Sequence, residues 1–511
     1  METMKQGNVE GEERFATLLN NAGAIRAICA AVEGTLGPKG LDTMLVGNRG
    51  EVLVTNDGAT ILDKMDVTHP AARMLVQVAR SQQNEIGDGT TTATVLAGAL
   101  VSEAVNEVLR GVPVAKVVGG LTDAVHRALD SLASRSRPIE GLDDPNLYRI
   151  ALIAGREHTD IAELVIEAAR RLGIESLRDD KFRFADLIDV HEHQSNEFWP
   201  GLLISQKPVH AQMCDLEIDS SAVLVLNDAF EPERQEEEAF ATEAGFQRHL
   251  QLKEQFVANL RKLLHLGVRL VVSDRGVDPA AEQFCADHGI MVLSRVPKRA
   301  LERICEHTGA RPVRRAALNK SEDELTGCLG RCGPISYDRR IARVRLSGGS
   351  GKPTATVLVG ASTREVAGER ARIARDAASA VQAAIRGGYV PGGGAVEIAV
   401  AHELDRYRET VKGMEAFGVA AVAKALRKPL AQMVQNAGFN PLEKIEQVRA
   451  AQLTHKSDSL GIDCDTGLVT DCLARGVIDP TLVKMHALRA AGEVAAAVLR
   501  IHTVIKMKSD E

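Results

Sequence analysis

Residues 87–92, Gly-Asp-Gly-Thr-Thr-Thr, combine the residue types that a phosphate site requires. Glycine lets backbone N–H groups come close to a phosphate, and a helix N-terminus adds unpaired N–H groups and a positive dipole end. Three threonine hydroxyls provide further donors, and Asp88 could bind the Mg²⁺ that accompanies a triphosphate. The pattern is not a P-loop, because the Lys-Ser/Thr pair is missing. A helix start capped by Asp and Thr is the alternative interpretation.

Two further glycine-rich segments could contribute to the same site. Residues 36–40, Leu-Gly-Pro-Lys-Gly, could line the phosphates or form only a turn. Residues 391–395, Pro-Gly-Gly-Gly-Ala, open a helix that contains Glu397. Three glycines before a helix are costly in backbone entropy unless a ligand must come close, and a flexible hinge is the alternative.

Two carboxylates outside these loops could act on a water molecule. Asp57 lies in an Asn-Asp-Gly turn, where turn formation alone explains it, and Asp376 lies in a helical stretch, where it could simply pair with Arg372. Phosphoryl transfer to water requires a group that orients the water, together with metal and phosphate contacts. Asp57, Asp88 and Asp376 would supply these roles if the fold brings them together.

A zinc site is disfavoured. Cys305, His307, Cys328 and Cys332 have irregular spacing, with a long segment between the two pairs. The His-Glu-His of residues 191–193 would place two imidazoles on one strand face, but no third ligand is evident.

The elements that must position these loops differ along the chain. The segment up to about residue 136 has helical apolar spacing interrupted by Gly-rich loops, and the last third, from about residue 387, has the same character. Between them, short apolar runs at 222–226, 268–272 and 290–293 alternate with helical stretches, which is typical of an α/β domain. We therefore expect the two ends of the chain to form one domain around an insertion.

Composition narrows the class of protein. At roughly 100–200 residues per domain, 511 residues indicate about three domains. A net charge of −7 argues against nucleic-acid binding. The longest charge-free stretches have about 14 residues, too few to span a membrane. The polar N-terminal residues do not resemble a targeting peptide, and eight scattered cysteines fit a reducing, cytoplasmic location.

Taken in order, five segments together resemble the nucleotide-site blocks of the chaperonin family, and the match covers nearly the whole chain. The blocks are residues 36–40, 55–60, 87–92, 391–395 and 476–480. Residues 56–62, residues 391–395, the ending at 487–505 and the insert after Ala229 are similar to the group II type, which comprises the thermosome and the eukaryotic cytosolic chaperonin.

The resemblance implies a multidomain α and α/β fold. A mainly helical equatorial ATP-binding domain would comprise residues 1–136 and 387–511, and a small α/β intermediate hinge would comprise residues 137–198 and 361–386. An α/β apical domain, residues 199–360, would bind unfolded polypeptide and carry a lid insert at about 230–264. The implied function is an ATPase that assembles into two stacked rings and encloses polypeptides without a separate lid co-chaperonin.

The resemblance also implies roles for single residues. Asp57 and Asp376 would be catalytic, by positioning the hydrolytic water, and Asp88 would bind Mg²⁺. Contacts to ATP would come from Leu36, Gly37, Pro38, Gly87, Asp88, Gly89, Thr90, Thr91, Thr92, Gly392, Gly393 and Asp479.

The chain departs from the group II pattern in three places. Residues 154–157 read Ala-Gly-Arg-Glu where the group usually ends a Ser/Thr-rich segment in Gly-Lys, so Arg156 is expected to replace the lysine that senses the terminal phosphate. Residues 231–250 are more acidic than a typical lid helix, and residues 311–345 match poorly. These differences indicate a divergent, bacterial branch.

A ring-forming scaffold that binds nucleotide but folds nothing remains the alternative, and a soluble small-molecule kinase is a third possibility.

Overall fold

The computed structural model describes residues 2–47, 50–192, 195–233 and 243–505. The chain divides into two compact units. Unit 1 comprises Met1–Ile166, Asp180–Ala185 and Ile373–Glu511, and unit 2 comprises Glu167–Asp179 and Asp186–Arg372. Two long helices, α7 (Thr159–Leu172) and α13 (Arg364–Gly387), run from one unit into the other. The three predicted domain boundaries remain predictions.

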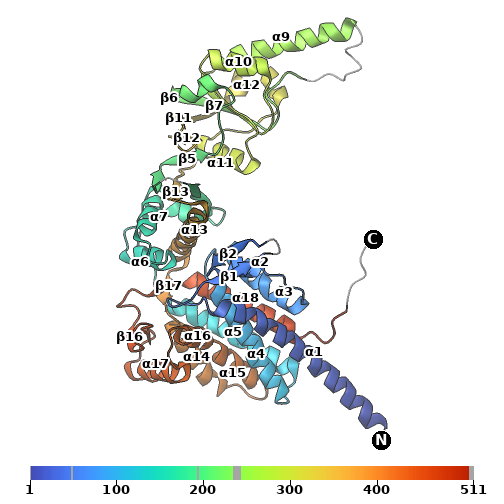
Figure 1. Ribbon diagram of the computed structural model, residues 1–511, viewed down its shortest axis with the longest axis vertical. Helices are drawn as coiled ribbons and strands as arrows, with labels where there is room; N and C mark the ends of the chain where they lie inside the picture. Colours follow the sequence, from blue (N-terminus) through green and yellow to red (C-terminus); the bar gives the residue numbers. More distant parts are fainter. Residues whose placement is uncertain (1, 48–49, 193–194, 234–242, 506–511) are drawn as a thin grey trace. The chain divides into compact units, whose positions relative to one another are not determined.

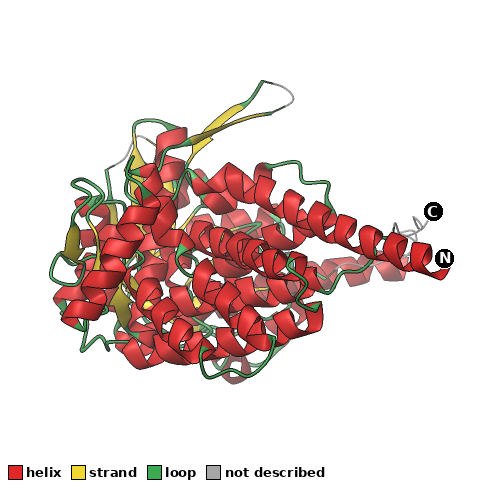
Figure 2. Cartoon of the chain, turned by 90° about the horizontal axis from the view of Figure 1, so that it is seen from below, coloured by secondary structure: helices red, strands yellow, loops and turns green. Residues whose placement is uncertain are grey.

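Unit 1 is built mainly from helices, shown in red in Figure 2. Besides parts of α7 and α13, they are α1 (Glu2–Glu33), α2 (Gly58–Lys64), α3 (Pro70–Glu85), α4 (Thr90–Leu109), α5 (Val114–Arg135), α6 (Pro145–Ala154), α14 (Ala395–Arg408), α15 (Glu415–Ala425), α16 (Lys428–Asn436), α17 (Pro441–His455) and α18 (Thr481–Leu499). Its strands form three antiparallel pairs: β1 (Thr43–Val46) with β2 (Val52–Thr55), β14 (Tyr389–Pro391) with β17 (Ile478–Pro480), and β15 (Leu460–Ile462) with β16 (Val469–Asp471).

Helix α4 lies at the centre of unit 1, where it packs against α1, α3, α15 and α18 (Figure 1). By length and composition it is the one described helix apolar enough to cross a membrane, yet 67% of that stretch is buried inside the unit. It is therefore the core helix of a folded unit. Because α18 comes from the chain end and α4 from its beginning, both ends share one core, as the sequence predicted.

Small residues allow the helices of unit 1 to come close together. Helices α5 and α15 meet at Gly120 and Gly418, where a Cβ on Gly120 would lie 1.9 Å from the Glu415 carbonyl oxygen and a Cβ on Gly418 would lie 2.3 Å from the Val117 carbonyl oxygen. The low aromatic and high Ala, Val and Gly content is thus the composition of closely packed helices.

Unit 2 contains three small sheets. The first has the order β10-β7-β8-β9, the second β5-β12-β11-β6, and the third β3-β13-β4. Their strands are β3 (Ile188–Glu192), β4 (Glu197–Trp199), β5 (Gly201–Ile204), β6 (Glu217–Ile218), β7 (Ser221–Leu226), β8 (Val268–Ser273), β9 (Met291–Leu293), β10 (Gly330–Cys332), β11 (Ile335–Asp338), β12 (Arg343–Ser347) and β13 (Thr356–Ala361). The predicted apolar runs become the parallel strands β7, β8 and β9.

The helices of unit 2 cover these sheets. They are α8 (Ile174–Arg178), α9 (Glu243–His265), α10 (Pro279–Asp287), α11 (Lys298–Thr308) and α12 (Glu322–Thr326). Sheet and helices enclose one apolar core, in which Phe230 and Phe256 meet edge to face with ring centroids 5.6 Å apart.

Helix α9 has two different halves. Phe256, Leu260 and Leu263 in its second half are buried in the core of unit 2, whereas Phe246 and Leu250 in its first half are exposed. Figure 1 shows the first half extending beyond the rest of the unit. Of the predicted lid insert, residues 234–242 lie outside the described part of the chain. The second half of α9 is an ordinary core helix, so the predicted lid could include only its first half and remains a prediction.

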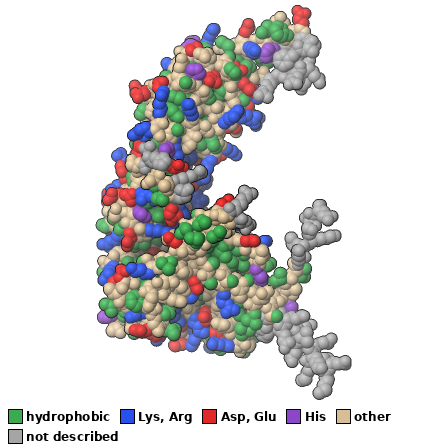
Figure 3. Space-filling view, viewed as in Figure 1, with side chains coloured by type: hydrophobic (Ala, Val, Ile, Leu, Met, Phe, Trp, Pro, Cys, Tyr) green, Lys and Arg blue, Asp and Glu red, His purple; other side chains and the backbone are tan. Residues whose placement is uncertain are grey.

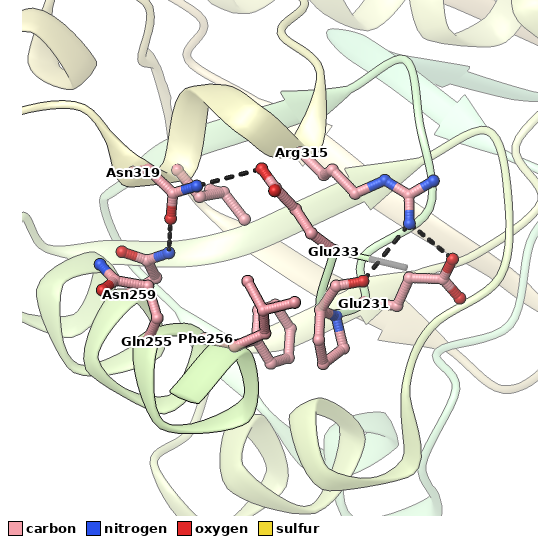
Figure 4. Close-up of a pocket in the computed structure, with 10 residues that line it drawn as sticks. Glu231, Glu233, Gln255, Phe256, Asn259, Arg315 and Asn319 are labelled. Carbon is pink, nitrogen blue, oxygen red and sulfur yellow. Dashed lines mark hydrogen bonds and ion pairs between the residues drawn. The ribbon is translucent and has the colours of Figure 1, made fainter. Parts of the chain in front are cut away.

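Hydrogen bonds and an ion pair hold the two ends of the predicted lid insert against residues 315–319 (Figure 4). The Arg315 guanidinium donates to the Glu231 carboxylate at 2.7 Å, and the Asn319 amide donates to Glu233 at 3.2 Å while accepting from Asn259 at 2.8 Å. They surround a cavity of about 20 Å³, enough for one water molecule.

A buried ion pair stabilises the second sheet of unit 2. The Asp338 carboxylate on β11 accepts from the Arg345 guanidinium on β12 at 2.7 Å, and only about a tenth of either side chain is exposed. Burial raises the pKa of Asp338, but hydrogen bonds from Arg340 and Arg345 outweigh burial and lower it to about 2.

Candidate functional site

The 87–92 loop connects α3 to α4 with two glycines in left-handed backbone conformations. Gly87 has φ of 86° and Gly89 has φ of 77°. A Cβ on Gly87 would lie 2.3 Å from the Ser379 hydroxyl oxygen, and one on Gly89 would lie 2.5 Å from a Val483 methyl carbon. Both positions therefore require glycine for conformation and for space. Gly89 is the N-cap of α4, so the free N–H groups of the first turn belong to this loop.

Asp88 lies between these glycines in a charged environment. Its Oδ1 accepts from the Gly89 N–H at 2.6 Å. Burial raises the pKa of the Asp88 carboxyl to about 6; the Gly89 hydrogen bond opposes this rise, and the charge of Asp479 adds to it. Lys484 and Arg156 are close enough to lower it. A carboxylate held in this way is one that a nearby cation would stabilise.

Gln82 on α3 holds the backbone of this loop, a role that the sequence did not reveal. Its buried amide donates to the Asp88 carbonyl oxygen at 2.7 Å and to the Val483 carbonyl oxygen at 3.2 Å. Its oxygen contacts the His486 ring nitrogen at 2.7 Å. A glutamine on an amphipathic helix usually faces solvent, so only the fold shows that this one is buried.

The turn that contains Asp57 packs directly on the 87–92 loop. Asp57 is the N-cap of α2, and its Oδ2 accepts from the Thr60 N–H at 2.8 Å and from the Thr60 hydroxyl at 2.6 Å. Asp57 therefore has a local structural role as a helix cap, which turn formation alone did not predict. A Cβ on Gly58 would lie 2.4 Å from the Thr91 hydroxyl oxygen, so the two segments are in contact.

Arg156 approaches the same turn from the end of α6. Its guanidinium donates to the Asn56 side-chain oxygen. Arg156 and Glu157 both have left-handed backbones, with φ of 50° and 62°, which is uncommon for residues other than glycine. The strained turn directs Arg156 toward Asn56, and its charge acts on Asp88.

A second group of residues comes from the last third of the chain. Strands β14 and β17 pair with Val390 opposite Asp479, and the Gly392 N–H donates to the Val477 carbonyl oxygen at 2.9 Å. A Cβ on Gly392 would lie 3.1 Å from the Asp479 carboxylate carbon. Gly392 and Asp479 are thus neighbours. Gly393, with φ of 61°, adjoins Gly392 in the turn that opens α14.

Lys484 pairs with this group, and its charge also acts on Asp88. Its ammonium lies 2.8 Å from the Asp479 carboxylate and 2.7 Å from the Glu397 carboxylate. The sequence did not single out Lys484, because a lysine in the first turn of a helix usually faces solvent.

Asp376 lies on α13, one helical turn before Ser379. Residues three apart lie on the same face of a helix, and the Ser379 hydroxyl is in contact with Gly87. Asp376 is thus on the face of α13 that borders the 87–92 loop, about 4.5 Å along the helix axis from Ser379.

The loop of residues 36–40 is held by other elements of unit 1. The Asn436 amide on α16 donates to the Leu36 carbonyl oxygen at 2.9 Å, and a Cβ on Gly37 would lie 2.6 Å from a Met433 side-chain carbon. Lys39 pairs with Asp465 at 2.5 Å, in the turn between β15 and β16. Contact of Leu36, Gly37 and Pro38 with a nucleotide remains a prediction.

The donor set at Asp88 fits a magnesium ion that arrives with a triphosphate. Mg²⁺ in such sites is bound by one or two carboxylates, phosphate oxygens and water, so a cage of protein ligands is not required. Among the described residues, no group of three or more His, Cys, Asp or Glu side chains is placed to hold a metal ion alone. The cysteines near residues 305–332 are not part of any such group among the described residues.

Fold and site together define a helical nucleotide-site unit joined to an inserted α/β unit, and comparisons with known proteins agree. The model of the TCP-1/cpn60 chaperonin family matches residues 28–509. The chain is 33% identical to a thermosome subunit of Pyrococcus abyssi, covering 97% of this chain and 92% of that protein. It is 34% identical to the thermosome subunit alpha of Thermoplasma acidophilum, covering 96% and 91%.

A crystal structure of a group III chaperonin in the open state superposes with a TM-score of 0.88. It is 44% identical and covers 97% of this chain and 100% of the other. The chain belongs to the TCP-1/cpn60 chaperonin family. It is a group II-like, ATP-dependent chaperonin of the double-ring type, so the resemblance seen in the sequence is confirmed.

Proposed function

We propose that this chaperonin hydrolyses ATP at the site in unit 1 and uses the cycle to enclose and release unfolded polypeptides in the cytoplasm. The convergence of separate segments on the 87–92 loop carries the proposal. Gly58 packs on Thr91, Ser379 lies against Gly87, and the charges of Arg156 and Lys484 act on Asp88. A capped helix alone would explain none of these contacts.

Each residue then has a chemical role. The free N–H groups at the start of α4 and the hydroxyls of Thr90, Thr91 and Thr92 bind phosphate oxygens. Asp88 would hold Mg²⁺, which neutralises charge on the phosphates when bound. Asp57 and Asp376 orient and polarise the attacking water, and Arg156 stabilises the terminal phosphate.

An exposed apolar hairpin supports assembly into two stacked rings. Met44, Val46, Val52 and Val54 on β1 and β2 are each more than half exposed. Figure 3 shows hydrophobic side chains gathered over these strands. Contiguous exposed apolar surface usually marks an interface with another protein. The exposed first half of α9 supports a lid built into the chain, so no separate lid co-chaperonin is proposed.

The test combines ATP turnover with recovery of a chemically denatured model enzyme. The parent protein should release free phosphate from ATP and raise the yield of refolded enzyme. Asp376→Ala should bind ATP but lose most turnover and refolding. If the parent binds ATP and forms rings in electron micrographs without refolding, it is a scaffold. Transfer of phosphate to an acceptor molecule would instead indicate a kinase.

A further inference from the structure

Gln82 holds the loop of residues 87–92 on both sides of Asp88. Its backbone carbonyl oxygen accepts from the Gly87 N–H at 3.0 Å, and its side-chain amide donates to the Asp88 carbonyl oxygen at 2.7 Å. The same amide donates to the carbonyl oxygen of Val483, near the start of α18, at 3.2 Å. Helix α18 packs against both α3 and α4, and all three are labelled in Figure 1. Gln82 is fully buried, so these hydrogen bonds do not compete with bulk water.

The peptide group between Asp88 and Gly89 transmits this constraint to the Asp88 carboxylate. Its C=O accepts from the Gln82 amide, and its N–H donates to Asp88 Oδ1 at 2.6 Å. The C=O and N–H of one planar trans peptide group point in opposite directions, so rotation of the group moves both. A rotation that breaks the bond to Gln82 therefore also takes the Gly89 N–H away from the carboxylate. The orientation of the Asp88 carboxylate thus depends on the Gln82 amide.

His486 fixes which way the Gln82 amide faces. Carbonyl oxygens can only accept, so the amide nitrogen must face Asp88 and Val483, and the amide oxygen must face His486. The His486 Nδ1 lies 2.7 Å from that oxygen and is therefore the donor. Without this donor, the buried Gln82 oxygen loses its partner, and the amide is no longer held in the one orientation that binds the loop.

The hydrogen bond from His486 does not depend on the charge of the ring. Burial lowers the pKa of His486 below its ordinary value, and the charge of Arg489 adds to this effect, while the charges of Glu85 and Glu493 oppose it. Nδ1 carries a hydrogen in the imidazolium and in the neutral tautomer that donates to Gln82. His486 is therefore a fixed donor, not a pH switch.

We propose that His486 is a positioning residue for the Asp88 carboxylate and acts through the Gln82 amide and the 88–89 peptide group. Loss of a group that orients a metal-binding side chain typically weakens metal binding roughly 10- to 100-fold. This inference rests on the proposed function, in which Asp88 binds Mg²⁺. The alternative is that Gln82 and His486 only join α3 to α18, and such a connection would have no particular effect on the metal.

The experiment measures the dissociation constant of ATP for the full-length protein by calorimetry, once with Mg²⁺ and once with EDTA. The ratio of the two constants is the magnesium gain, the factor by which Mg²⁺ strengthens ATP binding. His486→Ala should lower the magnesium gain roughly 10-fold. Binding of ATP with EDTA should stay within about threefold of the parent value, because the phosphate contacts of the loop do not require the metal.

Two further variants test the route through Gln82. His486→Asn places an amide N–H donor at the position of Nδ1 and should keep the magnesium gain within about threefold of the parent. Gln82→Met keeps the length of the side chain but removes its donors and its acceptor, so it should lose at least as much gain as His486→Ala. Combining Gln82→Met with His486→Ala should cause no further loss, because both changes break the same connection.

Gln452→Met is the matched control for stability. Gln452 is also a buried glutamine whose amide donates to two carbonyl oxygens, those of Ala395 at 2.9 Å and Leu460 at 2.8 Å. These bonds hold the start of α14 and of β15 and not the 87–92 loop. Gln452→Met should therefore lower the melting temperature but keep the magnesium gain of the parent.

Equal weakening of ATP binding with Mg²⁺ and with EDTA in His486→Ala would overturn the proposal, because the residue would then act on the loop as a whole. A parent-like magnesium gain in His486→Ala, an equal loss in His486→Asn, or a further loss in the double variant would overturn it as well. If Mg²⁺ does not strengthen ATP binding to the parent protein, the proposed metal role of Asp88 is wrong, and this inference fails with it.

Discussion

Gly58 and Thr91 pack so closely that a Cβ on Gly58 would lie 2.4 Å from the Thr91 hydroxyl oxygen and 3.2 Å from the Thr91 Cα. Gly58 is the first residue of α2, and Thr91 lies in the first turn of α4. This contact joins the turn that carries Asp57 to the loop that carries Asp88. The relative position of the Asp57 and Asp88 carboxylates, the proposed catalytic and metal-binding groups, thus depends on the absence of a side chain at Gly58.

Gly58→Ala is therefore expected to lower ATP turnover with the fold intact. An added methyl group must push the Asp57 turn away from Thr91, and misplacement by about 1 Å can reduce a rate roughly 100-fold. Phosphate release measures the effect. Gly141→Ala is the control, because a Cβ there meets nothing within 4 Å. Unchanged turnover in Gly58→Ala would show that this contact does not position Asp57.

The strained turn at Arg156 gives a second prediction. Arg156→Gly relieves a left-handed backbone, so the free energy of unfolding should stay the same or rise by up to about 1 kcal/mol. The melting temperature should accordingly stay the same or rise slightly. It also removes the guanidinium, so ATP turnover should fall at least roughly 10-fold. Glu157→Gly relieves the neighbouring strain and should retain turnover. An equal loss in both variants would assign the effect to the backbone, not to the Arg156 side chain.

The two halves of α9 should respond differently to substitution. Phe246→Ser alters an exposed side chain, so stability should change by less than about 0.5 kcal/mol, whereas the yield of refolded model enzyme should fall. Phe256→Ala removes a buried ring from the core of unit 2 and should destabilise it by roughly 3–5 kcal/mol. Melting curves and refolding assays distinguish the outcomes. A full refolding yield for Phe246→Ser would contradict a role for this residue in the lid.

Asp338 gives a prediction about acid stability. Its folded pKa of about 2 is below its usual value of 3.8, so the carboxylate contributes stability above about pH 4 that is lost as the pH falls toward 2. Asp338→Asn should lower stability at pH 7 by roughly 2 kcal/mol, and its difference from the parent should narrow between pH 4 and 2.

Asp215→Asn is the control for this measurement, because Asp215 pairs with Arg339 at the exposed surface. Its effect on stability should be within about 0.5 kcal/mol at every pH. A constant difference between Asp338→Asn and the parent from pH 7 to pH 2 would contradict the assigned pKa.

The glycine loops could be predicted from the sequence because the local backbone conformation requires glycine at these positions. Gly87 and Gly89 adopt left-handed backbones next to a helix start, and the apolar spacing around them predicts α4 directly. The pattern of apolar runs likewise predicted β7, β8 and β9. Order and separation of the loops then indicated the family that the full-length match confirmed.

Gln82 and Lys484 could not be predicted in this way. Both are polar residues on helices, where sequence favours exposure. Gln82 is buried against α18, which lies 401 residues further along the chain, and Lys484 is largely covered through its ion pairs with Asp479 on β17 and Glu397 on α14. The partners of Lys484, Glu397 and Asp479, come from two other elements, so no local spacing encodes the group. Domain boundaries and the catalytic roles of Asp57 and Asp376 remain predictions for the same reason.

The bond from Gln82 to Val483 spans 401 residues and has a consequence during synthesis on the ribosome. At about 5–20 residues per second, the two partners emerge roughly 20–80 s apart. Until α18 is made, the face of α4 that it covers has no partner in the nascent chain. Gln82, which holds the loop around Asp88, also lacks its hydrogen bond to Val483. A chaperonin subunit of this design completes the proposed nucleotide site only when α18, the last of the described helices, has left the ribosome.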